Sequence, residues 1–299
     1  MPKIQYKEIN FRQSSLDLIN LVNEVIDDYK AQGYELTLRQ VYYQLVARGY
    51  IPNNERSYKN IGNLINDGRL AGLIDWYAIT DRTRNLRGNS HWDTPADVIA
   101  SAKYSYLLDK WAGQPNYVEV WVEKDALVDV VGQACRPLDV PYFSCRGYTS
   151  QSEMWVAARR FLRQCDREQR IIIHLGDHDP SGIDMTRDIQ DRLEMFGADV
   201  IVKRVALTMN QIDHYNPPPN PAKITDSRCG RYIAQYGHES WELDALEPKV
   251  ITTLINQEVT MYRDDTLYRQ VCGKESREKE ELQLLCDRYG EAVSYLMEG

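Results

Sequence analysis

The stretch RIIIHLGDHDPSG, residues 170–182, joins a short apolar run to two aspartates and a Pro-Ser-Gly turn. The run has the length and β-branched character of a buried strand. Asp177 and Asp179 follow it, and on an extended segment residues i and i+2 point to the same side. One interpretation is a helix start that Asp179 caps, with no role for Asp177. The other is a pair of ligands for a hard cation.

Strands alternate with helices on both sides of this stretch. The pattern predicts strands at 116–122, 140–147, 170–176 and 199–207, and helices at 124–135, 150–168 and 181–197. Such alternation is typical of a parallel sheet with helices on both faces, which predicts an α/β domain over residues 116–215. The carboxyl ends of parallel strands meet at one edge, where functional groups collect.

Glu123 ends the first predicted strand and is therefore expected beside Asp177 and Asp179. Three carboxylates at one edge repel one another unless they are protonated or neutralised by a cation. Oxygen ligands of this kind suit Mg²⁺, for which Mn²⁺ can substitute. The sequence thus predicts a metal site formed by these three residues. Without the aspartate pair, a strand-end ion pair of Glu123 with Lys124 or Arg146 would be the preferred interpretation.

Residues 1–92 predict a separate helical domain. Helices are expected near 15–32, 38–49 and 57–72, followed by a strand-prone piece at 73–80, which is typical of a winged helix-turn-helix. Residues 34–92 carry eight Arg and Lys against five Asp and Glu, in a chain of net charge −8. A three-helix module without a nucleic-acid role fits the same pattern. The candidate nucleic-acid contacts are Arg56, Lys59, Asn63 and Arg69, with Arg146 from the α/β domain.

The remaining segments are predicted to be helical. Residues 93–115 form a connecting helix, and residues 216–299 form a mostly helical region after the proline-rich hinge at 215–223. We expect an apolar stripe near the end to pack on its own chain: Leu282, Leu285, Tyr289, Val293 and Leu296. Four polar residues are candidates for further site contacts or for surface and interdomain packing: Asp226, Arg228, Glu242 and Asp244.

Composition places the chain among folded proteins of the cytoplasm. Hydrophobic residues make up 43% and charged residues 27%, which is ordinary for a globular protein. The six cysteines form no CxxC pair, which favours reduced thiols over structural zinc. No apolar run is long enough for a membrane span, and the first residues lack the apolar core of a signal peptide. We therefore expect no membrane association.

Three segments together resemble the Toprim domain: VEVWVEKDAL (118–127), CRGYTSQSEMWVAARR (145–160) and IIIHLGDHDPSGIDM (171–185). The version they resemble is that of the topoisomerase VI A subunit and the meiotic double-strand-break transesterases. The resemblance implies that Glu123, Asp177 and Asp179 bind Mg²⁺, with Glu123 also serving as acid or base. Upstream, LRQVYYQLV (38–46) matches the family pattern of an arginine, three residues and a nucleophilic tyrosine, at Arg39 and Tyr43.

The resemblance implies Mg²⁺-dependent DNA strand cleavage through a 5′-phosphotyrosyl intermediate on Tyr43, with Arg39 holding the phosphate. It also implies a homodimer, in which the tyrosine of one protomer meets the metal of the other, and a separate ATPase subunit if the protein performs a topoisomerase cycle. Tyr43 also fits core aromatic packing. Two alternatives remain: a hydrolytic Toprim nuclease of a phage-defence or mobile-element system, acting on DNA or RNA, and a non-catalytic DNA-binding protein.

Overall fold

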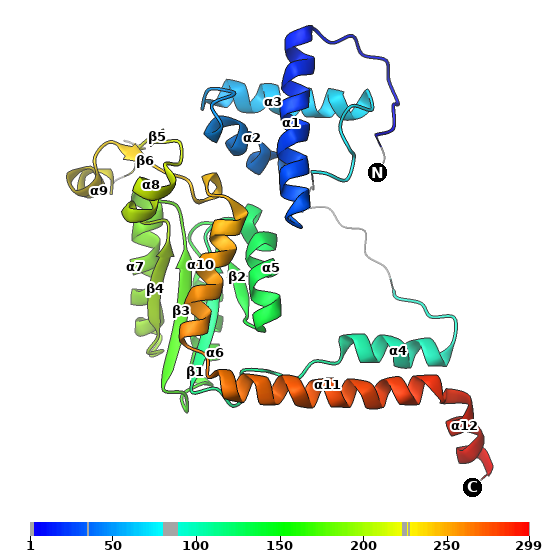
Figure 1. Ribbon diagram of the computed structural model, residues 1–299. Helices are drawn as coiled ribbons and strands as arrows, with labels where there is room; N and C mark the ends of the chain where they lie inside the picture. The colour runs from blue at the N-terminus through cyan, green and yellow to red at the C-terminus, as the bar shows by residue number, and fades with distance from the viewer. Residues whose placement is uncertain (1–2, 35, 80–88, 223–225, 227, 299) are drawn as a thin grey trace.

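The computed structural model describes residues 3–34, 36–79, 89–222, 226 and 228–298. Within these residues, an α/β unit contains a four-stranded parallel sheet in the order β2-β1-β3-β4 (Figure 1). This confirms the predicted α/β class, with a parallel sheet flanked by helices. The strands are β1 (Asn116–Val122), β2 (Tyr142–Ser144), β3 (Gln169–Leu175) and β4 (Ile201–Ala206).

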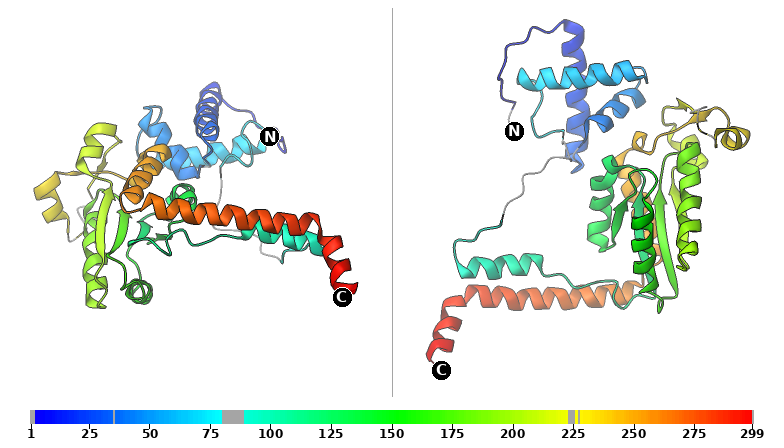
Figure 2. Two further views of the ribbon diagram at one scale, coloured as in Figure 1. Left: turned by 60° about the horizontal axis from the view of Figure 1, so that its bottom comes forward. Right: turned by 180° about the vertical axis from the view of Figure 1, so that it is seen from behind.

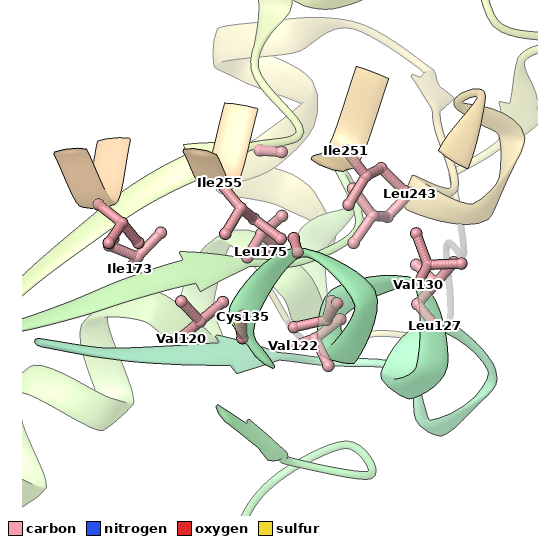
Figure 3. Packing of buried hydrophobic residues seen from close by; sticks show 14 of the residues in the cluster. Val120, Val122, Leu127, Val130, Cys135, Ile173, Leu175, Leu243, Ile251 and Ile255 are labelled. Carbon is pink, nitrogen blue, oxygen red and sulfur yellow. The ribbon is translucent and has the colours of Figure 1, made fainter. Parts of the chain in front are cut away.

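Helices bury both faces of this sheet. One face packs against α5 (Val128–Leu138), which follows the short helix η1 (Asp125–Leu127), and against α10 (Pro248–Met261). The other packs against α6 (Gln151–Leu162) and α7 (Pro180–Met195). Successive strand residues alternate between the faces, so Val120 and Ile173 contact the α5–α10 side (Figure 3) while Trp121 faces α6 and α7. Burial on both faces explains the nearly continuous apolar strands.

One charged residue lies inside this packing. Glu119 of β1 is 2% exposed, and its carboxylate accepts hydrogen bonds from Tyr117 Oη at 2.8 Å and Trp121 Nε1 at 2.9 Å. Arg160 of α6 donates two more, at 2.6 and 2.9 Å. The carboxylate is thereby fully hydrogen-bonded, as a buried charge requires.

We expect a Glu119→Ala substitution to lower the free energy of unfolding by about 2–3 kcal/mol. This loss of unfolding free energy is smaller than that for a fully buried ion pair, because the Arg160 side chain is 38% exposed and retains some hydration. Urea denaturation measures it, with the exposed pair Lys59–Glu55 as the comparison. A Lys59→Ala change should have a much smaller effect because both partners are exposed, and an equal effect at both positions would contradict this account.

The N-terminal unit consists of α1 (Gln13–Ala31), α2 (Leu38–Ala47) and α3 (Glu55–Leu70). Thr37 and Gln40 cap α2 reciprocally through side chain and backbone. The three helices share a core of their own, which includes Val22, Val41 and Ile61. Figure 1 shows this unit beyond one end of the sheet, opposite the end at which α4 and α11 lie.

The strand predicted at 73–80 is not formed over the described residues 73–79, which contain only an isolated bridge from Ile79 to Leu36. Turns account for the difference. The N–H groups of Leu73 and Ile74 donate to the Gly68 carbonyl, and Asp75 Oδ1 accepts from the Tyr77 N–H. Local hydrogen bonding therefore overrides the apolar, strand-like composition. Thr80 lies outside the described residues.

Two distant segments form a helical arm. The connecting helix predicted over residues 93–115 is shorter in the structure: α4 (Pro95–Ser105) ends before Tyr106, and the N–H groups of Leu108 and Lys110 donate to the carboxylates of Glu275 and Asp139 instead. This helix packs along α11 (Asp265–Asp287), beyond which α12 (Tyr289–Glu298) continues (Figures 1 and 2). Lys103 bonds to Gln283 and Tyr106 to Glu278 across this pair. The expectation that the apolar stripe packs on its own chain is wrong for two of its members, since Leu285 is 45% and Leu296 is 77% exposed. The arm extends away from the core that would have covered them.

Short elements connect the sheet to α10. They are α8 (Met209–Tyr215), β5 (Asn220–Pro221), α9 (Cys229–Tyr236), β6 (Glu239–Ser240) and η2 (Leu243–Ala245). β5 and β6 pair antiparallel. In the part of the chain that the structure describes, no helix combines the length and apolarity needed to cross a membrane.

Candidate functional site

The three predicted metal ligands lie at the carboxyl ends of β1 and β3. Glu123 Oε2 accepts a hydrogen bond from the Asp177 N–H at 2.9 Å. The same oxygen lies close to Gly176 and Gly182, where a Cβ atom on either residue would be 2.9 Å from it. The glycines therefore make the space that the Glu123 carboxylate occupies. The ion pairs considered for Glu123 are not formed, because Arg146 pairs with Asp125 and Lys124 with other acids.

The two aspartates of the Asp-His-Asp loop have different partners. Asp179 caps α7, with its Oδ1 accepting from the Gly182 N–H at 2.6 Å. Asp177 is 6% exposed, and its Oδ1 accepts from the Leu243 N–H at 2.8 Å and lies 3.0 Å from Lys124 Nζ. The capping interpretation thus describes Asp179, but Asp177 is not idle.

Residues 238–246 form a second wall of the site. His178 and Trp241 exchange two backbone hydrogen bonds, of 2.8 and 3.0 Å, which places the wall beside the Asp-His-Asp loop. Glu242 and Asp244 then reach Lys124, whose Nζ is 3.0 Å from Asp244 Oδ1 and also contacts Glu242. The sequence around these two acids indicates no definite role for them, because their partners lie more than a hundred residues away.

Arg39 connects the N-terminal unit to this wall. Its Nη2 lies 2.7 Å from Glu242 Oε2, and its Nε lies 2.9 Å from Asp244 Oδ2. The guanidinium carbon is also 5.6 Å from the ring centre of Tyr43, one helical turn along α2. Tyr43 lines a cavity of about 270 Å³ together with Asp177 and Asp179. Tyr43 and the two aspartates therefore line one cavity within a single chain, whereas Glu123 lines another together with Arg39.

Burial shifts the protonation of several groups. It raises the pKa of Asp177 to about 8, with Glu123 adding to the effect against the opposing charge of Lys124. Burial also raises the pKa of Glu123. For Tyr43, burial and the nearby Glu242 raise the pKa to about 12, so its hydroxyl keeps its proton at neutral pH. Buried Arg204 compensates part of the charge and donates to the carbonyl oxygens of Gly176, Asp177 and Gly182.

The three carboxylates do not form a preformed metal cage. Among the described residues, no three His, Cys, Asp or Glu side chains are already arranged around a common metal position. Each of Glu123, Asp177 and Asp179 uses one oxygen for a backbone N–H. No hydrogen bond from a described residue reaches the second oxygen of any of the three. Those three oxygens fit the chemistry of Mg²⁺ or Mn²⁺.

The candidate nucleic-acid residues are distributed unevenly. Arg56 and Asn63 are exposed on α3, and Lys59 pairs with Glu55 at 2.7 Å. Arg146 is 75% exposed near Glu123 and pairs with Asp125 at 3.0 Å. Arg69 instead donates to the carbonyl oxygens of Trp76 and Ile79, at 3.1 and 2.5 Å, and so holds the turn after α3.

Protein-family models, curated proteins and solved structures were compared with the chain, and none matches it. A function for this chain is therefore argued from its own geometry.

The raised pKa of Asp177 makes stability depend on pH. Between about pH 4 and about pH 8 the folded protein keeps a proton that the unfolded chain loses, so stability falls as pH rises through this window. Asparagine cannot ionise. Unfolding free energies are measured by urea denaturation in EDTA for the wild type and for Asp177→Asn. We expect the value for the wild type to fall relative to that of the variant as the pH rises to about 8, and the difference to stay constant above about pH 8. A constant difference across the window would contradict the buried, protonated state of Asp177.

Proposed function

We propose that the protein is a Mg²⁺-dependent enzyme that cleaves the DNA backbone, with a Toprim-type α/β domain and a winged-helix-type N-terminal domain related to the topoisomerase VI A subunit. The observation that carries the proposal is the shared cavity of Tyr43, Asp177 and Asp179. A potential nucleophile and a carboxylate cluster at the ends of parallel strands are what metal-assisted phosphoryl transfer needs.

Glu123, Asp177 and Asp179 would hold the Mg²⁺ ion, for which Mn²⁺ can substitute. When bound, the ion supplies positive charge that stabilises the phosphoryl oxygens and the leaving 3′ oxygen. Tyr43 Oη forms the bond to phosphorus as the bond from phosphorus to the 3′ oxygen breaks. The phenolic proton passes to solvent, and the 3′ oxygen gains a proton, for which the carboxyl group of Glu123 is the candidate donor.

Arg39 has two roles in this proposal. Its charge lowers the pKa of Tyr43 against the effect of burial, and a phosphate can compete with Glu242 for its exposed side. The arginine side chain is 43% exposed, so it is accessible from solvent. A homodimer would present two such sites to a duplex, as a double-strand cut requires, and a separate ATPase subunit would be needed only for a topoisomerase cycle.

The raised pKa of Tyr43 favours a second candidate. A hydroxyl with a pKa of about 12 is a weak nucleophile at neutral pH. In a hydrolytic nuclease acting on DNA or RNA, water would attack the phosphorus, the protein would form no covalent bond, and Tyr43 would pack beside the acids.

Nicking of supercoiled plasmid in Mg²⁺ separates these candidates. We compare the wild type with Tyr43→Phe, Asp177→Asn and the control Tyr77→Phe, since Tyr77 is 74% exposed. Transesterification predicts loss of nicking in the first two variants and wild-type protein trapped on the DNA 5′ end by denaturant. Hydrolysis predicts loss only in Asp177→Asn, with RNA tested in parallel. If the wild type cuts neither nucleic acid, the enzyme proposals fail and the non-catalytic DNA-binding alternative is favoured.

A further inference from the structure

A second, larger cavity lies between α7 and α9, next to the acidic site. Its volume is about 700 Å³, within the range of small-molecule sites. One of its lining residues is Pro180, which directly follows Asp179. Six of the residues that line it carry charge or an aromatic hydroxyl: Asp184, Arg187, Arg228, Arg231, Tyr232 and Tyr236.

The wall of this cavity is bonded directly to the Asp-His-Asp loop. Tyr232 Oη donates to the His178 carbonyl at 2.8 Å and also lies 2.8 Å from His178 Nδ1. The His178 ring meets the Tyr236 ring edge to face, with centroids 4.7 Å apart. Pro180, which lines the cavity, directly follows Asp179, so the cavity adjoins the start of α7 that Asp179 caps.

The charges of the wall favour an anion with a planar group. Arg187 and Arg228 share the carboxylate of Asp184, at 2.7 and 3.2 Å, which fixes their planar guanidinium groups. Arg231 is exposed, and no ion pair to it is formed within the described residues. Arginine binds phosphate through paired N–H donors, and tyrosine rings stack on nucleobases. Tyr236 is half-buried at the cavity wall and so presents a fixed aromatic surface.

We propose that this cavity binds one nucleotide of the nucleic-acid strand, with Arg231 contacting its phosphate and Tyr236 its base. This assignment rests on the proposed action on nucleic acid and deepens it, since it gives the strand a second anchor beside the acidic site. A fixed nucleotide on one side of the cut would position the neighbouring phosphodiester over Asp177 and Asp179. Arg231 is thus a binding residue outside the cleavage machinery.

Equilibrium binding of a short fluorescent single-stranded thymidine oligonucleotide tests this without requiring cleavage. Fluorescence anisotropy is measured in EDTA over a series of KCl concentrations, for the wild type, Arg231→Glu and Arg277→Glu. Arg277 is an exposed arginine of α11 and provides the matched control. We expect Arg231→Glu to weaken binding about tenfold. The slope of the logarithm of the binding constant against the logarithm of the KCl concentration should become shallower by roughly 0.7, the value for one phosphate contact on a single strand. Arg277→Glu should bind as the wild type does.

A competition experiment identifies the ligand class. Thymidine monophosphate should displace the oligonucleotide from the wild type at a lower concentration than inorganic phosphate does, because only the nucleotide engages Tyr236. Displacement by inorganic phosphate at the same concentration as thymidine monophosphate would overturn the nucleotide assignment. If Arg231→Glu and Arg277→Glu weaken oligonucleotide binding equally, or if neither weakens it, the cavity is not the binding site. Binding through Arg231 without any cleavage would uphold the cavity while the cleavage proposal fails. Cleavage by the wild type, with oligonucleotide binding unchanged in Arg231→Glu, would uphold the cleavage proposal and overturn the cavity.

Discussion

A Gly182→Ala variant is expected to lose both the proposed nucleic-acid cleavage and a large part of its stability. The added Cβ would lie 2.9 Å from Glu123 Oε2 and closer still to the carbonyl oxygen of Asp177. Neither atom can retreat freely, since Glu123 Oε2 accepts from the Asp177 N–H and the Asp177 carbonyl accepts from buried Arg204. Overpacking of this kind costs about 1–3 kcal/mol, and the shift would separate the carboxylates. Urea denaturation and plasmid nicking measure the two effects.

Gly273 provides the matched control for this change. It is exposed on α11, and a Cβ there would meet nothing within 4 Å. Because alanine favours a helix over glycine, Gly273→Ala should increase the unfolding free energy by about 0.5–1 kcal/mol and leave cleavage unchanged. If Gly182→Ala is as stable and active as the wild type, the packing of Glu123 between the glycines does not hold the site together.

Lys124 is the second position at which we expect a large effect. Its side chain is 14% exposed and contacts three carboxylates: Asp177, Glu242 and Asp244. Burial alone would lower the pKa of Lys124, but Asp244, Asp177 and Glu242 raise it, so the ammonium stays charged. A Lys124→Met substitution removes the ammonium that contacts Asp177 and leaves Glu242 and Asp244 with Arg39 as their charged partner. It should cost about 3–5 kcal/mol of unfolding free energy in EDTA.

Divalent cations should restore part of that stability. Added Mg²⁺ can neutralise the carboxylates that Lys124 contacts in the wild type. It should therefore raise the unfolding free energy more in Lys124→Met than in the wild type. Urea denaturation with EDTA and with Mg²⁺ measures the difference, and Lys59→Met, which removes an exposed partner of Glu55, should show neither effect. A variant that is strongly destabilised but equally insensitive to Mg²⁺ would show that Lys124 acts through packing alone.

Local patterns predicted the elements that carry the three acids. β1 occupies residues 116–122 as expected, and β3 differs by one residue from the predicted 170–176. The reason is that a buried parallel strand has a continuous apolar sequence that ends where its polar residues begin. The strands in turn placed Glu123 beside Asp177.

Contacts between distant segments could not be predicted in this way. Glu242 and Asp244 reach the site because Trp241 pairs with His178, and no local periodicity of residues 241–246 indicates that pairing. Likewise, α10 completes the core of the sheet although it belongs to the region predicted only as mostly helical. Arg69 has the spacing of an exposed recognition residue, but the turn after α3 offers it two carbonyl groups. Tertiary partners decided each of these positions.

Binding of Mn²⁺, observed by electron paramagnetic resonance, tests the central claim most directly, because it reports on the carboxylates without depending on the identity of the nucleophile. We expect the wild type to bind Mn²⁺ and to release it on addition of excess Mg²⁺, and we expect Asp177→Asn and Glu123→Gln to bind it far more weakly. Tyr43→Phe should bind as the wild type does. Unchanged Mn²⁺ binding in Asp177→Asn and Glu123→Gln, or no binding by the wild type, would contradict the assignment of a metal site to Glu123, Asp177 and Asp179.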